Sequence, residues 1–337
     1  MAAPKKRGMQ TVVFDNPPCL TCWASIVGPK EGEGPWGDSF DVKLKDYLLE
    51  ETTWEKAESK LLQDTVTFAL SKRGFEIDDA EVLLAGDLLN QITSANFAAR
   101  TLNLPFLGLF GACSTMAESL ILGAMLLDGG FCERVIAATS SHHYAAERQF
   151  RFPIEQGVQR SPSAQWTATA SGAVVLEKGS LGPRIIAATI GKIVDMGQKD
   201  ANNMGAAMAP AAGDTIKMHL TDLDLLPDYY DLIITGDLGS VGAALVQQIF
   251  TRDGLAPKPN YSDCGILLYD EKQDVHAGGS GCGCSAAMLC GPLLNKMQFG
   301  ELNKLLFVAT GALMSPTTSF QGESIPCIAH AVAIENL

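Results

Sequence analysis

Apolar and polar positions follow two recurring patterns along most of the chain. Short continuous apolar runs bounded by turn residues predict buried strands, and longer stretches with apolar residues at i, i+3, i+4 and i+7 predict helices. The two patterns follow one another in turn, as where "STMAESLILGAMLLDGG" is followed by "RVIAATS". This order predicts an α/β protein whose sheets are covered by helices.

The pattern also repeats within the chain. Residues 78–90, "DDAEVLLAGDLLN", have a counterpart in residues 228–240, "DYYDLIITGDLGS". Both stretches contain an acidic turn, a buried strand and then Gly-Asp-Leu. The repeat predicts two halves with the same fold, which we place at residues 1–180 and 181–337.

A second pair of motifs has the same spacing in both halves. Cys113 lies 26 residues before Thr139, and Cys284 lies 26 residues before Thr310. The Gly-Asp-Leu aspartate, however, precedes the Cys motif by 26 residues in the first half and by 47 in the second. The second half therefore carries 21 extra residues, for which we expect a loop and a further strand.

Cys113 stands where an apolar strand turns into a helix rich in small residues. The helix pattern of residues 114–130 stops at Gly129 and Gly130, which suit a helix C-terminus. Small residues at its start let a ligand approach the backbone, and the N–H groups there favour an anion or a thiolate. Cys113 is thus a nucleophile, a residue lining a pocket, or a plain core cysteine.

Composition and charge narrow the function. The chain of 337 residues is 47% hydrophobic and carries a formal net charge of -13, which argues against nucleic acid and against anionic lipid as partners. We expect neither a transmembrane segment nor a signal peptide, because no apolar run is long enough. Nine cysteines, an odd number, predict reduced thiols. Cys19 and Cys22 form a C-x-x-C without a second ligand pair, which favours a structural role.

Longer motifs carry a resemblance to known proteins. They are "GPKEGEGPWGDSFD", "LLAGDLLNQITSANFAAR", "FGACSTMAESL", "ATSSHHYAAERQFRFP", "MGAAMAPAAGDTIK", "ITGDLGSVG", "AGGSGCGCSAAM" and "ATGALMSPTT", and they span almost the full chain. On these motifs the chain resembles the thiolase and ketoacyl-synthase superfamily. Within it, the chain resembles the thiolase-like sporulation proteins of endospore-forming bacteria.

The resemblance implies a fold and a role. The fold is thiolase-like, with two pseudo-symmetric βαβαβαββ halves in a five-layer αβαβα arrangement, usually as a homodimer. The role is to move dipicolinic acid, possibly with calcium, into the developing spore. The chain would act as a peripheral protein at the cytoplasmic face of the forespore or spore inner membrane, with membrane proteins of the same sporulation complex as partners.

The catalytic groups of such enzymes are not all present. A condensing enzyme needs a thiolate, a His or His/Asn pair, and backbone N–H donors for the oxyanion. The second-half elbow that carries His or Asn in the family reads "GCGCSAA" here, with Cys282 and Cys284, and the strand end "ITGDLGS" has Asp237 near the expected place. A carboxylate beside a cysteine raises the thiol pKa. We therefore expect Cys113 to line a binding pocket, and the protein not to be an enzyme.

Asp87, in the equivalent turn of the first half, has two interpretations. Asp87 and Asp237 could face one pocket and share a proton or bind a cation such as calcium, or Asp87 could simply cap the following helix. Two carboxylates are few for calcium, so we expect no metal. No cofactor is expected either, since "GGSGCG" lacks the Gly-Lys-Ser/Thr ending of a phosphate loop.

The stretch "SSHHYAAERQFRFP" begins at a strand's C-terminal end, where open α/β sheets place their ligands. Its His142, Arg148 and Arg151 suit dipicolinate, because Arg binds a carboxylate bidentately and His can donate to it or stack on the ring. Each also has a structural alternative, a hydrogen-bonded His or an ion-paired Arg. His330, in the apolar last strand, is a pocket residue or a satisfied core His. Met204 is expected to pack a helix between the halves.

The sequence is compatible with three functions. The first is a non-catalytic dipicolinic-acid-binding protein of the sporulation machinery. The second is an acyl-transferring enzyme of the thiolase type that uses Cys113. The third is a ligand-free scaffold of a membrane complex.

Overall fold

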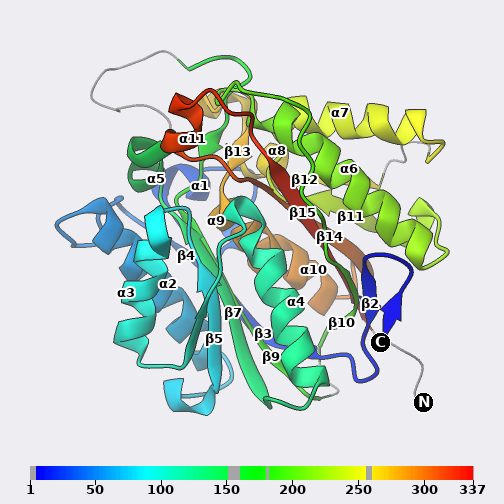
Figure 1. The fold of residues 1–337 in the computed structure, drawn as a ribbon. Coiled ribbons are helices and arrows are strands. Elements are labelled where there is room, and N and C mark those ends of the chain that lie inside the picture. The colour runs from blue at the N-terminus through cyan, green and yellow to red at the C-terminus, as the bar shows by residue number, and fades with distance from the viewer. Residues whose placement is uncertain (1–4, 151–159, 180–181, 256–259, 337) are drawn as a thin grey trace.

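The computed structural model describes residues 5–150, 160–179, 182–255 and 260–336. Two consecutive parts of the chain fold with the same order of elements (Figure 1). The first contains β3 (Cys19–Val27), α2 (Trp54–Ser71), β5 (Val82–Gly86), α3 (Thr93–Leu102), β6 (Phe106–Gly108), α4 (Thr115–Asp128), β7 (Arg134–Ser141) and β9 (Ala170–Glu177). The second contains β10 (Arg184–Thr189), α6 (Met204–Asp222), β11 (Leu232–Thr235), α7 (Gly239–Arg252), β12 (Tyr261–Asp263), α9 (Cys282–Met288), α10 (Leu294–Gln298), β14 (Lys304–Ala312) and β15 (Cys327–Glu335). Both have the order βαβαβαββ, as the sequence repeat predicts.

Strand pairing is also the same in the two halves. In the first half β5 pairs parallel with β6 and β7, and β9 pairs antiparallel with β7 and β3. In the second half β11 pairs parallel with β12 and β14, and β15 pairs antiparallel with β14 and β10. The two half-sheets are joined through one register pair between β10 and β3, in which Arg184 pairs with Cys19. Cys19 and Cys22 are therefore buried strand residues, as expected.

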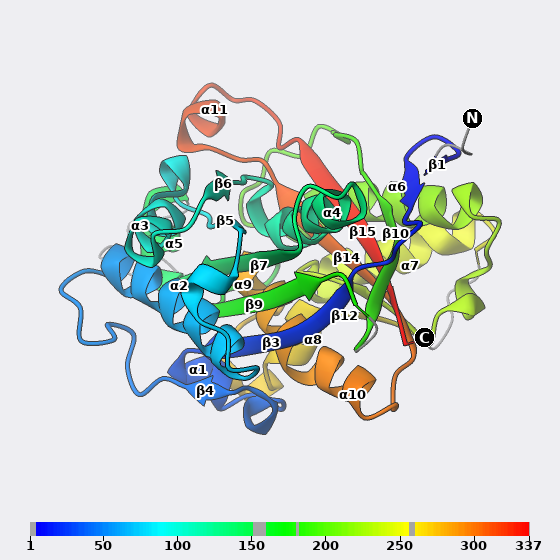
Figure 2. The same ribbon diagram turned by 90° about the horizontal axis from the view of Figure 1, so that it is seen from below.

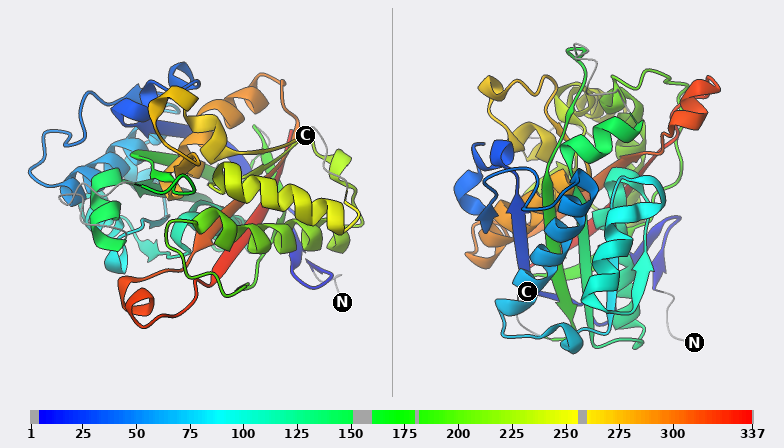
Figure 3. Two further views of the ribbon diagram at one scale, coloured as in Figure 1. Left: turned by 90° about the horizontal axis from the view of Figure 1, so that it is seen from above. Right: turned by 90° about the vertical axis from the view of Figure 1, so that its left-hand side faces the viewer.

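Helices separate the two half-sheets and cover their outer faces. α4 contacts β5 and β7 of the first half as well as β14 and β15 of the second, and α9 contacts β3, β7 and β9. α2 and α3 pack on the outer face of the first half-sheet, whereas α6 and α7 lie side by side on that of the second (Figures 2 and 3). This is the five-layer αβαβα arrangement, with the largest apolar cluster around α4 and α9 in the middle layer.

Local sequence explains where the main helices begin and end. The Thr53 hydroxyl accepts a hydrogen bond from the Lys56 N–H at the start of α2, and the Asn203 side chain does the same for Ala206 at the start of α6. α4 ends at Gly129, and Gly130 follows with a φ of 79°, a conformation that glycine adopts without strain. The predicted helix end is therefore confirmed.

The expectation for the extra residues of the second half is wrong in one respect. The strand inside that stretch, β12, is not an addition, because it pairs with β11 as β6 pairs with β5. The additional residues instead form α8 (Cys264–Leu268) and the segment leading to β13 (Gly279–Ser280). β13 pairs with β8 (Trp166–Thr167), so the insertion builds a two-stranded ribbon above the main sheet.

Smaller elements complete the described chain. They are β1 (Lys6–Arg7), β2 (Thr11–Val13), α1 (Pro29–Gly32), β4 (Val42–Lys43), α5 (His143–Phe150) and α11 (Pro316–Phe320). Among the described residues, no helix combines the length and the apolar character needed to cross a bilayer.

Candidate functional site

Cys113 lies in a short 3-10 turn, Ala112–Ser114, between β6 and α4. Two hydroxyls fix this turn: Ser114 Oγ donates to the Gly111 carbonyl at 2.7 Å, and Thr115 Oγ1 donates to the Ala112 carbonyl at 2.7 Å. Ala112 has a φ of 49°, which is costly for a residue with a Cβ atom. The fold thus holds Cys113 at a turn between a strand and a helix, as the sequence predicts, and the strain at Ala112 is a finding of the structure.

Asp237 reaches the same place from the other half of the molecule. It follows β11, and its fully buried carboxylate accepts hydrogen bonds from Thr310 Oγ1 at 2.6 Å, Ser280 Oγ at 3.1 Å and the Gly281 N–H at 3.1 Å. The Cys113 thiol lies within hydrogen-bonding reach of it. Cys113 and Asp237 are therefore neighbours, as the sequence predicts.

This environment disfavours the thiolate form of Cys113. Burial raises the pKa of the Cys113 thiol well above its ordinary value, and the negative charge of Asp237 raises it further. Burial also raises the pKa of Asp237, against the lowering effect of its hydrogen-bond donors. Since the thiolate is the reactive form, the pair favours an unreactive thiol.

A small apolar pocket adjoins the Cys113 thiol. Its volume is about 30 Å³, close to the ~30 Å³ that one water molecule occupies in the liquid. It is lined by Leu88, Phe110, Ala112, Cys113, Phe150, Thr167, Met204, Ser280, Ala312 and Met314. Residues of both halves thus meet around the thiol. Met204 contributes to this wall, so the expectation that it only packs a helix is incomplete.

The pocket opens into a larger outer groove of about 400 Å³. Four residues line both spaces: Leu88, Phe110, Phe150 and Met314. The groove continues over residues 88–92 and 313–316. None of the described residues lining either space is Arg, Lys or His, so the described walls offer no cation to a ligand.

Asp87 has the capping role and does not line the pocket. Its two carboxylate oxygens accept hydrogen bonds from the Leu89 N–H and from the Ala95 N–H in the first turn of α3, both at 2.7 Å. Burial raises the pKa of Asp87 to about 7. Its charged neighbour is Glu58, whose pKa is raised by burial and then by Asp87. These hydrogen bonds support the capping role of Asp87, and not an ion site shared with Asp237.

Cys282 and Cys284 begin α9 and are fully buried. Cys282 Sγ donates to the Ser140 carbonyl at 2.9 Å, and Cys284 Sγ lies 3.8 Å from the Gly236 carbonyl. Burial raises the pKa of both thiols well above the ordinary value. Neither Cys282 nor Cys284 is among the residues that line the Cys113 pocket.

His142 and Arg148 do not point at the pocket. Both ring nitrogens of His142 contact backbone groups: Nε2 donates to the Tyr47 carbonyl at 2.7 Å, and Nδ1 accepts from the Ala145 N–H. Burial lowers the pKa of His142. Arg148, on α5, forms an ion pair with Glu55. These are the structural alternatives that the sequence leaves open, and Arg151 lies outside the described residues.

His330 lies on β15 and is almost fully buried. Its Nδ1 accepts a hydrogen bond from the Gly191 N–H at 3.1 Å, and burial lowers its pKa to about 4. It is not among the residues that line the Cys113 pocket. His330 is therefore a neutral core histidine, and the interpretation as a pocket residue has no support from its position.

Sequence reasoning missed several residues that build the site. Ser280, Thr310 and the Gly281 N–H position Asp237, and Thr167 lies in the pocket wall. One signal was present: Thr310 is the residue that the repeat matches to Thr139. The others come from the short strands β8 and β13 and from Gly281 directly after β13, and nothing in the sequence pattern shows that this ribbon approaches Cys113.

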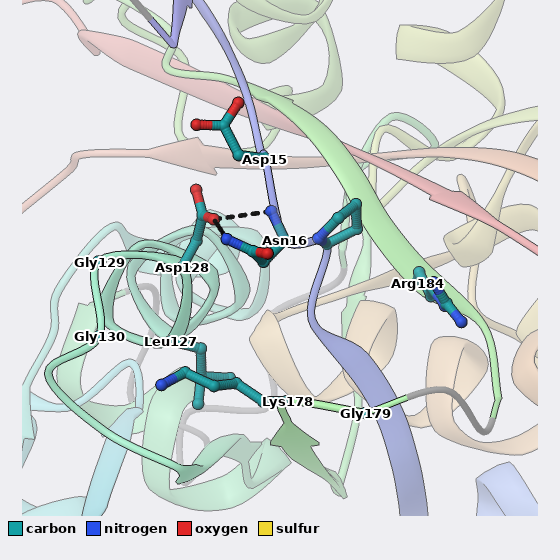
Figure 4. Close-up of a pocket in the computed structure, with 10 residues that line it drawn as sticks. Asp15, Asn16, Leu127, Asp128, Gly129, Gly130, Lys178, Gly179 and Arg184 are labelled. Atoms are coloured by element: carbon teal, nitrogen blue, oxygen red, sulfur yellow. Dashed lines mark hydrogen bonds between the residues drawn. The ribbon is translucent and has the colours of Figure 1, made fainter. Parts of the chain in front are cut away.

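A larger surface groove lies elsewhere, at the end of α4 remote from Cys113. Its volume is about 610 Å³, and Figure 4 shows its lining residues. Asp128 accepts from the Asn16 backbone N–H at 2.9 Å and pairs with Lys5, while Arg184 lies across the groove (Figure 4). Its walls consist largely of turns and the C-terminus of α4. We therefore take the smaller space at Cys113 as the candidate site.

Solved structures share this architecture at low sequence identity. Over 95% of this chain and 100% of the other, the fold matches 3-oxoacyl-[acyl-carrier-protein] synthase III from Aquifex aeolicus VF5, with a TM-score of 0.58 and 11% identity. A variant of Xanthomonas campestris OleA matches over 96% of this chain and 100% of the other, with a TM-score of 0.61 and 12% identity. The fold and the Cys elbow thus define a protein of the thiolase-like class.

Sequence comparison then gives the family. Residues 8–335 match the family model described as Stage V sporulation protein AD. The chain is also 47% identical over 331 residues to the Stage V sporulation protein AD of Bacillus subtilis (strain 168), covering 98% of both chains. The chain belongs to the Stage V sporulation protein AD family.

Proposed function

We propose that this protein is a non-catalytic binding protein of the sporulation machinery that holds dipicolinic acid in the space beside Cys113. The observation that carries the proposal is the placement of the buried Asp237 carboxylate against the Cys113 thiol, at the position where a condensing enzyme keeps its nucleophile. The elbow and the pocket remain, but the thiol is held in its unreactive form. Membership of a sporulation protein family supports dipicolinate as the ligand.

Binding requires the pocket to open. A volume of about 30 Å³ is far below the ~300 Å³ at which small-molecule pockets begin. Phe150 and Met314 line both spaces, and Met204 lines the pocket at the thiol. Methionine side chains change rotamer at little cost, so the two spaces can merge without a change in the backbone.

The ligand's charge has to be balanced inside this space. Dipicolinate carries two carboxylates, and the described walls contain no Arg, Lys or His. Hydrogen-bond donors such as the Thr167 hydroxyl, a calcium ion carried by the ligand, or Arg151 outside the described residues can supply the balance. Binding with and without calcium separates the second of these from the others.

Calorimetric titration of the full chain with dipicolinate tests the proposal. Benzene-1,3-dicarboxylate is the control ligand, because it has the same shape without the ring nitrogen. We expect saturable heat with dipicolinate alone. Met314→Trp, which fills the mouth of the pocket, should weaken binding at least about tenfold. Met196→Trp is the matched control on an exposed side chain. No saturable heat at millimolar ligand contradicts the proposal.

Acyl transfer is the second candidate, and one observation favours it. The strained Ala112 turn still presents Cys113 at the start of α4, within a fold shared with condensing enzymes. Incubation with acyl coenzyme A followed by intact-mass analysis distinguishes the two. A stable acyl adduct that disappears in Cys113→Ala contradicts the non-catalytic proposal.

The assembly is also part of the proposal. We propose that the protein forms a homodimer and presents its ligand to membrane proteins of the same complex, as a peripheral protein at the forespore inner membrane. If complexes with those partners form normally while no ligand binds, the scaffold function replaces the binding function.

A further inference from the structure

The loop between β5 and α3 forms one wall of the candidate site. Residues 88–92 line the outer groove, and Leu88 lines the Cys113 pocket as well. Rotation of the methionine side chains can join the two spaces, but the width of the groove beyond them depends on the backbone of this loop. A change in the loop would therefore change access to the Cys113 thiol.

The middle of this loop is strained. Gln91 has a φ of 53° and Ile92 a φ of 47°, so two successive residues with a Cβ atom adopt the left-handed conformation. This conformation is costly for both, and most costly for Ile92, because its side chain is branched at Cβ. We call residues 90–92 the gate segment.

The strain in the gate segment is unusual for this chain. Among the described residues with a positive φ and a Cβ atom, Ile92 is the only β-branched one, and three others are Asn or Asp, which tolerate the conformation. Ala112 at the Cys113 elbow also has a positive φ. Three strained residues thus lie around the connected pocket and groove, and strain of this kind gathers at ligand clamps and switch regions.

Hydrogen bonds from Asp87 limit where the loop can move. Its carboxylate accepts from the Leu89 N–H before the gate segment and from the Ala95 N–H in α3 after it, both at 2.7 Å. Both partners and the carboxylate are buried. Movement is therefore confined to the gate segment, between two fixed ends.

The gate segment itself is held by hydrogen bonds that water can replace. The Asn90 N–H donates to Gln149 Oε1 of α5 at 3.0 Å, and Asn96 Nδ2 donates to the Gln91 carbonyl at 2.7 Å. Both bonds are exposed and join neutral groups, so exchanging them for bonds to water costs little. Weak restraints and a strained backbone lie in the same three residues.

The Ile92 side chain holds the segment against β6. A Cβ atom on Gly108 would lie 2.4 Å from Ile92 Cδ1, so the isoleucine packs directly on the backbone of the strand. This packing and the two exposed hydrogen bonds keep the strained conformation in place. Relaxation of Gln91 and Ile92 to a negative φ would lift Ile92 from Gly108 and widen the groove.

We propose that residues 90–92 are a gate of the outer groove, closed in the strained conformation and opened when Gln91 and Ile92 relax. The strain keeps the closed and open states close in free energy, so that a ligand selects the open one. The proposal rests on the proposed function, since it regulates the same pocket. Its test needs no dipicolinate.

Two variants of the full chain shift the gate in opposite directions. Gln91→Asn places a residue that tolerates a positive φ in the closed state, so the gate should open less often. Asn96→Ala removes the bond to the Gln91 carbonyl, so the gate should open more often. Hydrogen exchange measured by mass spectrometry on residues 88–95 reports the opening. We expect protection at least about threefold higher in Gln91→Asn and at least about threefold lower in Asn96→Ala.

The chain offers a matched control for each variant. Glu50 is also exposed and has a φ of 65°, so Glu50→Asn relieves strain away from the groove. Gln10 Nε2 donates to the Ile190 carbonyl in an exposed bond, so Gln10→Ala removes a comparable bond elsewhere. Neither control should change the protection of residues 88–95. Circular dichroism checks that all four variants fold.

Labelling of Cys113 shows whether the loop controls access to the thiol. The ratio of the rates with a bulky reagent, pyrene maleimide, and a small one, iodoacetamide, cancels the reactivity of the thiol itself. This ratio should rise in Asn96→Ala and fall in Gln91→Asn. Protection of residues 88–95 that is equal in the wild type and in both gate variants overturns the proposal, and so does a ratio that ignores a change in protection.

Dipicolinate binding separates this proposal from the proposed function. If protection and labelling change as expected and no variant binds dipicolinate, the gate is supported and the proposed function is not. If the wild type, Gln91→Asn and Asn96→Ala bind dipicolinate with the same affinity and label Cys113 alike, the proposed function stands and the gate is wrong.

Discussion

At the scale of single residues, the contact between Cys113 and Asp237 controls the chemistry of the site. Replacing Asp237 by Asn removes the negative charge beside the thiol while keeping a side chain of the same shape. The pKa of Cys113 should fall, since that charge raises it. We expect iodoacetamide to alkylate Cys113 at least about tenfold faster at pH 8, which corresponds to one pKa unit. Peptide mass spectrometry measures the rate at this residue.

The wild type and Cys113→Ala provide the controls for this measurement. Any labelling that remains in Cys113→Ala comes from the other eight cysteines and is subtracted. An unchanged rate in Asp237→Asn indicates that burial alone keeps the thiol unreactive.

A buried histidine gives a prediction for pH. His219 contacts Thr189 Oγ1 at 2.7 Å and Tyr230 Oη at 2.6 Å, and burial lowers its pKa to about 4. The unfolded chain binds a proton near pH 6.5, so between pH 6.5 and 4 it holds more protons than the folded chain. The free energy of unfolding should therefore decrease as the pH is lowered from 6.5 to 4, by up to ~3 kcal/mol for this residue.

His219→Gln removes this titration. We expect the variant to be less stable than the wild type at pH 7, and the difference to shrink as the pH falls from 6.5 toward 4. Urea unfolding at several pH values measures both curves. Curves that run parallel over this window contradict the assignment of the pH dependence to His219. Comparing differences is necessary because the buried carboxylates Asp87 and Asp263, with pKa values raised to about 7, contribute with the opposite sign.

At the scale of secondary structure, β6 has one unpaired edge among the described strands, as does β12 at the opposite end of the sheet. β6 is the last strand on one side of the sheet, and the side chains of Leu107 and Phe110 at and beyond it are about half exposed, at 50% and 52%. An apolar edge strand with free backbone groups is an open site for pairing with another strand. We expect the homodimer to form here, through antiparallel pairing of β6 with its copy.

Leu107→Lys tests this expectation. A lysine on each of two facing strands places like charges together, so the variant should be monomeric at concentrations where the wild type is a dimer. Leu226→Lys is the matched control, because Leu226 is also exposed but lies between α6 and β11, away from β6. Light scattering after size exclusion measures the mass. A wild type that is itself monomeric, or a Leu107→Lys variant that stays dimeric, is incompatible with this interface.

The elements themselves were largely predictable from the sequence. The strands carry continuous apolar runs, the helices carry a 3.6-residue period, and the internal repeat gave the order of elements twice. The assignment of β12 failed, because a strand of three residues has no pattern that shows which neighbour it will pair with. Only the pairing with β11 identifies it as the counterpart of β6.

At the scale of the whole molecule, glycines let the two halves approach each other closely. A Cβ atom on Gly311 of β14 would lie 2.1 Å from the Gly111 carbonyl, immediately before the Cys113 elbow. In the same way, a Cβ atom on Gly172 of β9 would lie 2.5 Å from the Ala286 carbonyl of α9. Both contacts are to backbone atoms, which cannot move aside as a flexible side chain can. The halves therefore fit together only where these positions lack a side chain.

Gly311→Ala should therefore disturb the site as well as the fold. We expect a loss of roughly 1–3 kcal/mol in the free energy of unfolding, the usual cost of overpacking, together with weaker ligand binding, because the elbow must shift. Gly179→Ala is the control, since a Cβ atom there meets no atom within 4 Å. Urea unfolding and calorimetry give the two quantities. An unchanged free energy of unfolding in Gly311→Ala would show that the Cys113 elbow can shift without cost.

The site was less predictable from the sequence than the fold. It identified Cys113 and Asp237, because each follows a strand in a repeated motif. It did not decide the roles of His142, Arg148 and His330, because these depend on partners that other segments bring near. Those partners are the Tyr47 carbonyl, the Glu55 carboxylate and the Gly191 N–H. Such contacts leave no periodic signal in the chain.

The placement of Cys113 and Asp237 in different halves has a consequence for the order of folding. Cys113 comes from the first half and Asp237 from the second, and the Thr310 hydroxyl that fixes Asp237 comes from β14, near the end of the chain. Contacts between residues so far apart in sequence form late, since the intervening chain must be ordered first. During synthesis the pocket is incomplete until β14 has left the ribosome. The pocket beside Cys113 is therefore complete only in the finished molecule, and in no shorter fragment that ends before this strand.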